Sequence, residues 1–338
     1  MRSVALILLA AACGRERHAA PVPAPTSSPS PSPSPSPAAP LDPGAAAAPS
    51  LACESLPFAH DSPVPEASGA AWLAVDSVPA LVVISDSGND GAYAIIDPET
   101  GVTREQGKLP LGTTAPGADD LEGVATRGDT VYAVSSPGWI RAWKRAGHGF
   151  ALVDGPYPLG PEDLPNRKGG MGDAVPTSDG MVCGAAFTNC GRNYEGLCLA
   201  PPGPEATDEL AGFVAAKADG HLYALALVAG RLVVDRTRAI AIASNGVIAD
   251  CAFDTDGTLL VGSNSLDFGG VFRVDGWRNP ATATVTRLTN LLLGFPETLA
   301  VRGDTVYRMS DLGGAPSLLA KYRCAGLRSF RAVPLLPR

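Results

Sequence analysis

The sequence predicts an all-β protein, a single β-propeller, because one hairpin pattern recurs along it at regular spacing. The clearest copies are GVATRGDTVYAVS at 123–135 and TLAVRGDTVYRMS at 298–310, which share RGDTVY in the same frame. Each copy is an apolar run, a tight turn and a second apolar run, which is typical of a β-hairpin. No long helical periodicity competes with this pattern.

The spacing of the copies predicts the number of blades. Six copies start at about residues 72, 123, 174, 214, 251 and 298, so the intervals are 51, 51, 40, 37 and 47 residues. Such intervals are close to one four-stranded propeller blade. The repeat favours six blades, with residues near 52–60 completing the last blade from the other end of the chain. Residues 193–201 can also form an inner strand, which makes 160–192 an insertion and leaves five blades.

The N-terminal segment predicts export. Residues 1–13 read MRSVALILLAAAC, a basic residue and a short apolar run followed by small residues before Cys13. This segment resembles a bacterial lipoprotein signal over residues 1–12, whose cleavage leaves Cys13 as a lipidated N-terminus. An ordinary secretory signal is the alternative. Residues 13–50 are rich in Pro, Ser and Ala, which predicts a disordered, semi-rigid tether. The propeller domain is then 51–338, held at the bacterial cell envelope and, in a Gram-negative organism, at the outer membrane.

The charge balance limits the partners of this domain. The first 50 residues hold three arginines and two acids, which leaves 23 basic and 32 acidic residues in the domain. An acidic surface does not attract nucleic acid or an anionic membrane. We expect a monomer that contacts the membrane through the lipid on Cys13, binds no nucleic acid, and has an unidentified small ligand or protein as its partner.

Six cysteines follow Cys13, and an even number in an exported chain suggests disulfides. Cys53 lies at the start of the domain and Cys324 near its end, so a bridge between them would tie the termini together. Cys198 and Cys251 fall on predicted inner strands. They are either buried free thiols or partners in a second bridge, and the sequence does not choose between the two.

Carboxylates recur where the predicted inner strands begin. The second strand of each hairpin returns to the same face and ends in residues such as Ser85-Asp86 and Ser310-Asp311. Oxygen donors from different blades would therefore converge around a channel mouth, and Ca²⁺ takes six to eight oxygen ligands. In the alternative interpretation the acids bond backbone amides or hold water. The predicted metal ligands are Glu122, Glu195, Asp250 and Glu297, where Glu195 replaces Phe213 if 193–201 is an inner strand.

Four short strings resemble one known family. DLEGVA at 120–125, NYEGLCL at 193–199, SDSG at 85–88 and FPETLAV at 295–301 are similar to motifs of the propellers with esterase-like activity of phytase, related to SdiA-regulated propellers. The resemblance implies a propeller fold, an exported location and hydrolysis of phosphate or carboxylic esters. Together with the repeat, it places these candidates on the channel face: Asp86, Asp120, Glu122, Asp173, Asn193, Glu195, Asp250, Glu297 and Asp311.

Two functions fit these observations. The first is a tethered binding propeller whose acidic face holds a cation, with calcium as the expected ion, and a ligand or partner. The GxSxG, HExxH and P-loop patterns are absent from the sequence, and no catalytic residue is identified. The second is a cation-dependent esterase or phosphatase, which the family resemblance implies.

Overall fold

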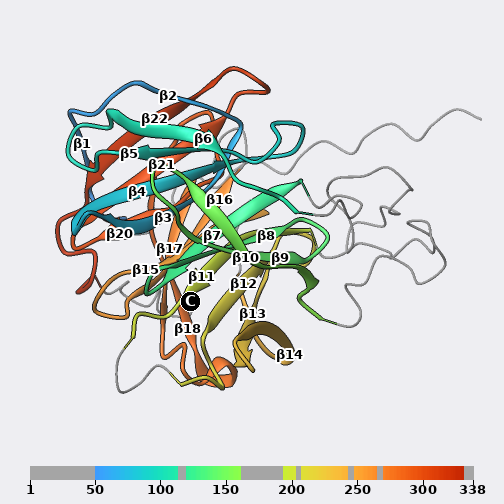
Figure 1. The fold of residues 1–338 in the computed structure, drawn as a ribbon. Coiled ribbons are helices and arrows are strands. Elements are labelled where there is room, and N and C mark those ends of the chain that lie inside the picture. The colour runs from blue at the N-terminus through green and yellow to red at the C-terminus, as the bar shows by residue number, and fades with distance from the viewer. Residues whose placement is uncertain are drawn as a thin grey trace, which may run out of the picture. The chain divides into compact units, whose positions relative to one another are not determined.

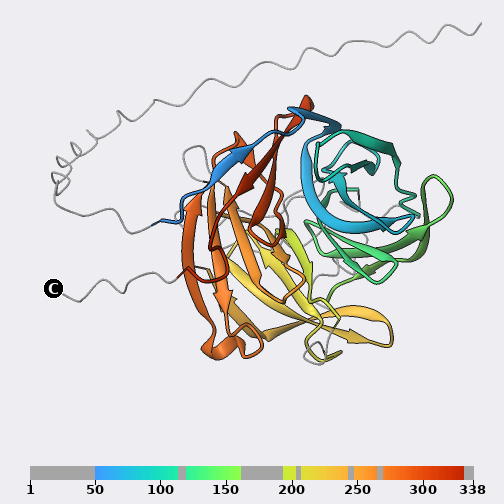
Figure 2. The same cartoon turned by 90° about the vertical axis from the view of Figure 1, so that its left-hand side faces the viewer.

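Four-stranded antiparallel sheets repeat along the chain, and inner strands from successive sheets lie side by side. In the described residues there are five such sheets, the last of which also takes in strands from the N-terminal end. Figure 2 shows the sheets in chain order around a ring, from blue through green and yellow to red. The predicted β-propeller is therefore confirmed. The computed structural model describes residues 50–112, 119–160, 193–202, 207–242, 247–264 and 269–330.

Each blade runs from an innermost strand beside the central axis to an outermost strand (Figure 1). The first two blades contain β3 (Ala67–Val75), β4 (Val78–Ser85), β5 (Ala92–Ile96) and β6 (Thr103–Lys108), then β7 (Leu121–Arg127), β8 (Thr130–Ser135), β9 (Trp139–Arg145) and β10 (Phe150–Pro158). Blades 3 and 4 contain β11 (Tyr194–Leu199), β12 (Gly212–Ala216), β13 (His221–Val228) and β14 (Arg231–Ala241), then β15 (Val247–Phe253), β16 (Leu259–Asn264), β17 (Gly270–Asp275) and β18 (Thr284–Asn290), with the short 3-10 helix η2 (Pro280–Thr282) before β18.

Strands from both ends of the chain build blade 5. Its strands are β19 (Phe295–Pro296), β20 (Ala300–Arg302), β21 (Thr305–Asp311) and β22 (Pro316–Arg323), with β1 (Glu54–Leu56) and β2 (Asp61–Pro65) added at the outer edge. Both N-terminal strands pair antiparallel with β22, and Figure 2 shows the blue segment beside the red one. A disulfide joins Cys53 to Cys324 at this closure. The expected completion of the last blade by residues near 52–60 is confirmed.

The described residues form five blades, which is the alternative that the sequence left open. The favoured count of six is therefore corrected to five. Tyr194–Leu199 is buried throughout and pairs with β12, so it is the innermost strand of blade 3. The hairpin at 214–226 therefore supplies the second and third strands of that blade, not its first two. The proposed copy at 174–186 lies outside the described residues, as do the signal and nearly all of the tether.

Apolar side chains fill each junction between neighbouring blades. Five buried clusters lie one per junction, and each draws on both adjoining sheets. Between blades 1 and 2, for example, Val82 and Ile84 pack with Val124 and Trp143. The inner strands, such as β11 and β16, are consequently buried on both faces, whereas the outermost strand β6 is largely exposed. A second disulfide, Cys198–Cys251, joins β11 to β15 and thus the inner strands of blades 3 and 4.

The two ends of the inner strands differ in chemistry. One end holds the hairpin turns, such as Gly128-Asp129 and Gly303-Asp304, where both glycines have a φ of 62°. A cavity of about 220 Å³ near these turns is lined by residues of all five innermost strands. We call this the turn end. The opposite end, where the inner strands begin and the second strands finish, is the channel mouth.

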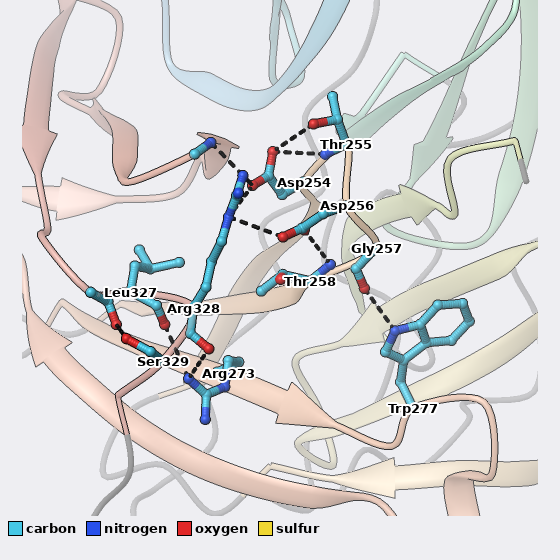
Figure 3. A network of polar contacts seen from close by, with 12 residues as sticks. Asp254, Thr255, Asp256, Gly257, Thr258, Arg273, Trp277, Leu327, Arg328 and Ser329 are labelled. Carbon is cyan, nitrogen blue, oxygen red and sulfur yellow. Dashed lines mark hydrogen bonds and ion pairs between the residues drawn. The ribbon is translucent and has the colours of Figure 1, made fainter.

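At the turn end, a polar network ties the C-terminal segment to blades 4 and 5 (Figure 3). Asp254 accepts hydrogen bonds from the amides of Thr255 and Gly303, and Arg328 forms ion pairs with Asp254 and Asp256. Arg273 donates to the carbonyl oxygens of Leu327 and Arg328. The carboxylates of this network are fully engaged in holding the fold together.

Candidate functional site at the channel mouth

A β-bulge near the start of each inner strand sets the first ring of side chains at the channel mouth. In blades 1 to 4 the pairing between the first and second strands skips one residue at this point. In blade 5 the amides of Glu297 and Thr298 both approach the carbonyl oxygen of Met309, which places Glu297 at the same position. Bulges re-aim a side chain out of the regular alternation of a strand. The bulge residues are Ser68, Glu122, Glu195, Ala249 and Glu297.

Asp250, a predicted metal ligand, lies one residue beyond the bulge in blade 4. Its carboxylate accepts hydrogen bonds from the amide of Cys251 at 2.7 Å and from the amide of Leu299 at 2.8 Å. Gly123 and Gly196 occupy the equivalent place in blades 2 and 3, where an added Cβ would lie 2.3 Å and 2.7 Å from the next inner strand. Asp250 thus joins blade 4 to blade 5 through its side chain.

The last residues of the second strands supply the other ring at the channel mouth. Ser85, Ser135, Ala216, Ser263 and Ser310 stand opposite the residue just before each bulge, and the residues after them are Asp86, Ser136, Lys217, Asn264 and Asp311. The sequence did not indicate Lys217 as a site residue, because the repeat pattern assigned the hairpin at 214–226 to the first and second strands of its blade. Taking residues 193–201 as an inner strand would have placed Lys217 at the position of Ser136.

Neighbouring members of the two rings bond to one another. Ser136 Oγ donates to Glu122 Oε1 at 2.9 Å, and it lies 3.1 Å from the side-chain oxygen of Asn193. Lys217 Nζ lies 2.9 Å from Glu195 Oε2. Asn264 Nδ2 donates to Glu297 Oε1 at 3.1 Å. These contacts link blade 2 to blade 3 and blade 4 to blade 5 at the channel mouth. A carboxylate oxygen of Asp86, from blade 1, lies close to those of Asp120 and Glu122. We call these side chains the polar cluster.

Burial and mutual repulsion make the glutamates of this cluster hard to ionise. Burial, followed by the charges of Glu195 and Asp86, raises the pKa of Glu122 well above its usual range. Burial likewise raises the pKa of Glu297 to about 8, and it raises the pKa of Glu195 although the ammonium of Lys217 opposes it. The pKa of Lys217 is raised in spite of burial, because Glu195 and Glu297 lie close to its ammonium group. Strongly shifted groups in one concave place mark a candidate functional site.

The cluster divides into two halves. On one side Lys217 compensates Glu195 and interacts favourably with Glu297. On the other side, Asp86, Asp120 and Glu122 each offer one carboxylate oxygen, and these three oxygens all lie within 4.8 Å of one another. Asp120 and Glu122 are buried, whereas Asp86 is half-buried. Oxygen-only donors at this spacing fit a hard divalent cation such as Ca²⁺.

Asn193 and Asp311 also lie at the channel mouth. Asn193 adopts a φ of 51° just before β11 and contacts Ser136. Asp311, the last residue of β21, accepts a hydrogen bond from the amide of Gly313 at 2.6 Å. Asp173 lies outside the described residues. The structure therefore brings together Asp86, Asp120, Glu122, Asn193, Glu195 and Glu297, with Asp311 near Glu297. Asp250 belongs to the framework.

Comparisons with known proteins return fold-level likenesses at low identity. The PQQ-bound aldose sugar dehydrogenase of Streptomyces coelicolor aligns with a TM-score of 0.44 and 15% identity over 81% of this chain and 99% of its own. Glutaminyl cyclase of Myxococcus xanthus aligns with a TM-score of 0.44 and 10% identity, over 80% of this chain and 96% of its own. Regucalcin of Agrobacterium tumefaciens, a calcium-binding protein, aligns with a TM-score of 0.42 and 13% identity, over 79% of this chain and 95% of its own. Such values carry no argument about ligand or activity.

Neither a protein-family model nor a curated protein matches the sequence. The resemblance to propellers with esterase-like activity of phytase therefore stays a prediction. Within the described part of the chain, no helix has the length and apolar character needed to cross a membrane.

Proposed function

We propose that this protein is a lipid-anchored, extracytoplasmic β-propeller whose channel mouth holds Ca²⁺ and uses it to bind a small ligand or a partner. The observation that carries this proposal is the close approach of the Asp86, Asp120 and Glu122 carboxylates. Three carboxylates at this distance repel one another strongly when ionised, and a divalent cation removes that repulsion.

The other half of the cluster suits a supporting role. Lys217 already neutralises Glu195, so the ion is expected beside Asp86, Asp120 and Glu122 rather than within the predicted set of Glu122, Glu195, Asp250 and Glu297. One oxygen of Glu195, Oε1, is buried without a hydrogen-bond partner among the described residues. It is a donor that a ligand or an ion-bound water could satisfy.

Calcium titration of the full-length protein tests this assignment. After treatment with EDTA, the free energy of Ca²⁺ binding is measured by calorimetry for the wild type, Asp86→Asn and Asp311→Asn. Asp86 and Asp311 each follow the equivalent serine, Ser85 or Ser310, but only Asp86 belongs to the close group of oxygens. We expect Asp86→Asn to weaken binding by about tenfold or more, since affinity follows the charge of the ligands, and Asp311→Asn to change it little. Equal losses, or no binding by the wild type, would contradict the site.

Hydrolysis is the second candidate, and the pKa of Glu297 favours it. A carboxyl group with a pKa of about 8 can exchange a proton near neutral pH, as a general acid or base must. The test is turnover of generic phosphate and carboxylic esters with Ca²⁺ and with EDTA. Calcium-dependent turnover that Glu297→Gln abolishes while the fold is retained would favour the hydrolase over the binding protein.

The anchoring part of the proposal rests on residues 1–13. Diacylation of Cys13 would supply the two chains that stable membrane attachment requires. Cys13→Ala is expected to move the protein from the membrane fraction to the soluble extracytoplasmic fraction. Retention of that variant in the membrane would rule out Cys13 as the anchor.

A further inference from the structure

A groove between blades 1 and 5, near the turn end, is chemically unlike the channel mouth. It encloses about 370 Å³, which is the size of a small-molecule site. One wall comes from β4 and the loop before β6, and the other from the sheet of blade 5. Its polar lining includes Arg104, Arg302, Thr305, Tyr307, Lys321 and Arg323.

The groove is basic in an acidic domain. Four cationic side chains line it, against one carboxylate, that of Glu99. Glu99 is bound to Lys321 Nζ at 2.8 Å, and its side chain is 82% exposed. Arg104 pairs with Asp97, which lies outside the lining. Two of the four cations, Lys321 and Arg104, are therefore already neutralised, and Arg302 and Arg323 supply the excess charge.

Arg302 and Arg323 flank a hydroxyl group in one cross-strand row. Arg302 stands opposite Thr305 on the neighbouring strand, and Thr305 stands opposite Arg323 on the next. Directly opposed residues of antiparallel strands project to the same face with Cβ atoms about 5 Å apart. Glu54 follows in the same row, opposite Arg323. In the described part of the chain, no carboxylate forms an ion pair with Arg302 or Arg323.

Neighbouring aromatic rings hold Arg302 in place. Its guanidinium carbon lies 4.6 Å from the centre of the Trp72 ring. The indole is fixed in turn, because Trp72 Nε1 donates to the carbonyl oxygen of Val301 at 2.7 Å. The rings of Trp72 and Tyr307 also pack edge to face, with their centres 5.6 Å apart. A guanidinium ordered before binding loses less entropy when it captures an anion.

We propose that this groove binds a small organic anion bearing a phosphate-type group. Arg302 and Arg323 supply the paired N–H donors that match phosphate oxygens, and the hydroxyl of Thr305 lies between them. Leu56, Val78 and Pro79 form an apolar part of the lining that would contact the organic portion. Because blade 5 combines the first strands, β1 and β2, with the last strand, β22, an anion bridging it to blade 1 would also stabilise the closure of the ring.

Pyrophosphate serves as the probe, with the full-length protein kept in EDTA so that metal chelation makes no contribution. Calorimetry and melting temperature are measured for the wild type, Arg302→Gln, Arg323→Gln and Arg278→Gln. The last is a matched control, since Arg278 stacks on Trp277 at 4.3 Å but does not line the groove. We expect pyrophosphate to raise the melting temperature and to bind more weakly by about tenfold in each groove variant, with the control unchanged.

Three results would overturn the proposal. They are no binding by the wild type at millimolar pyrophosphate, an equal loss in Arg278→Gln, and affinity that does not fall as salt rises. If Arg302→Gln disturbs the Trp72 packing and fails to fold, Arg323→Gln carries the test, because no aromatic contact involves Arg323 in the described residues. Inorganic phosphate and glycerol are run beside pyrophosphate, and binding of glycerol alone would show that the organic portion, not the anion, is recognised.

Discussion

The channel mouth and the turn end both contain buried aspartates or glutamates, but the two regions differ in how far hydrogen-bond donors and cations compensate these carboxylates. At the turn end, Asp254 accepts from two backbone amides and from Arg328, which also pairs with Asp256 (Figure 3). At the channel mouth, Glu122, Glu195 and Glu297 share Lys217 as the cation that acts on all three. Carboxylates are therefore structural at one end and under-compensated at the other.

The pKa values follow the same division. Burial acts upward on Asp256, but hydrogen bonds from Thr258 and the charge of Arg328 lower its pKa overall. Burial dominates at Glu122, where further acids add to it instead of opposing it. Burial of a carboxylate alone therefore does not mark a functional site. The mark is burial without enough donors or cations, because such groups keep their capacity to bind something else.

The largest expected effect is on the pH dependence of stability without metal. The pKa values of Glu122, Glu195, Asp250 and Glu297 are raised in the folded state, so the native protein binds more protons than the unfolded chain above pH 4.5. Stability must then fall as pH rises, by up to about 1.4 kcal/mol per pH unit for each titrating group. Urea unfolding in EDTA at pH 5, 6, 7 and 8 measures this. A free energy of unfolding that rises over this range would show that the folded state does not raise the pKa values of these carboxyl groups.

The next largest effect is expected from Asp254→Asn. An amide cannot balance Arg328, and its NH₂ group faces amides that need an acceptor, so the free energy of unfolding should fall by about 3 kcal/mol. Calcium affinity at the channel mouth should stay unchanged, since the network lies at the other end of the blades. Chemical denaturation and calcium titration of the same variant check both halves of this prediction.

Glu122→Gln should act in the opposite direction. In EDTA at pH 8 the folded protein must either ionise this buried carboxyl group beside Asp86, Asp120, Glu195 and Glu297 or keep it protonated against the bulk pH, and glutamine removes both costs. Ser136 can still donate to the side-chain oxygen. We expect stability to rise by about 1 kcal/mol and stabilisation by Ca²⁺ to be lost. Destabilisation in EDTA would show that Glu122 is a framework residue like Asp254.

The smallest effect is expected from Asp256→Asn. Its side chain is 38% exposed and its ion pair with Arg328 is open to solvent, so the loss should be at most about 1 kcal/mol. Added salt should reduce the difference between this variant and the wild type. A loss as large as that of Asp254→Asn would mean that exposure does not separate the two aspartates.

Much of the fold could be predicted because hairpins are local. The hairpins at 123–135 and 298–310 have equivalent registers, with Arg127 opposite Thr130 and Arg302 opposite Thr305. Turn residues and alternating apolar runs determine such pairing over short distances. The closure of the ring by residues near 52–60 was also predicted, since a propeller has one incomplete blade at the chain ends.

Register near the site was harder to predict, for a physical reason. Blade 4 has a five-residue turn, 254–258, where blades 2 and 5 have two-residue turns. Its hairpin is therefore one residue longer, counted from the bulge to the serine that ends the second strand. Aligning the thirteen-residue copies therefore placed Asp250 at the bulge, which Ala249 occupies. A shift of one residue changes the direction of a strand side chain, and so Asp250 bonds Leu299 instead of facing the cluster.

The sequence by itself determined the strands, the repeated hairpins and the presence of acids near one end of the blades. It also predicts that the chain is exported. Tertiary structure decided which acids are neutralised. Lys217 meets Glu195, Arg328 meets Asp254 across 74 residues, and Asp86 meets Glu122 from a neighbouring blade. Electrostatic compensation depends on distance in space and on burial, and both are created only when the five sheets close into a ring.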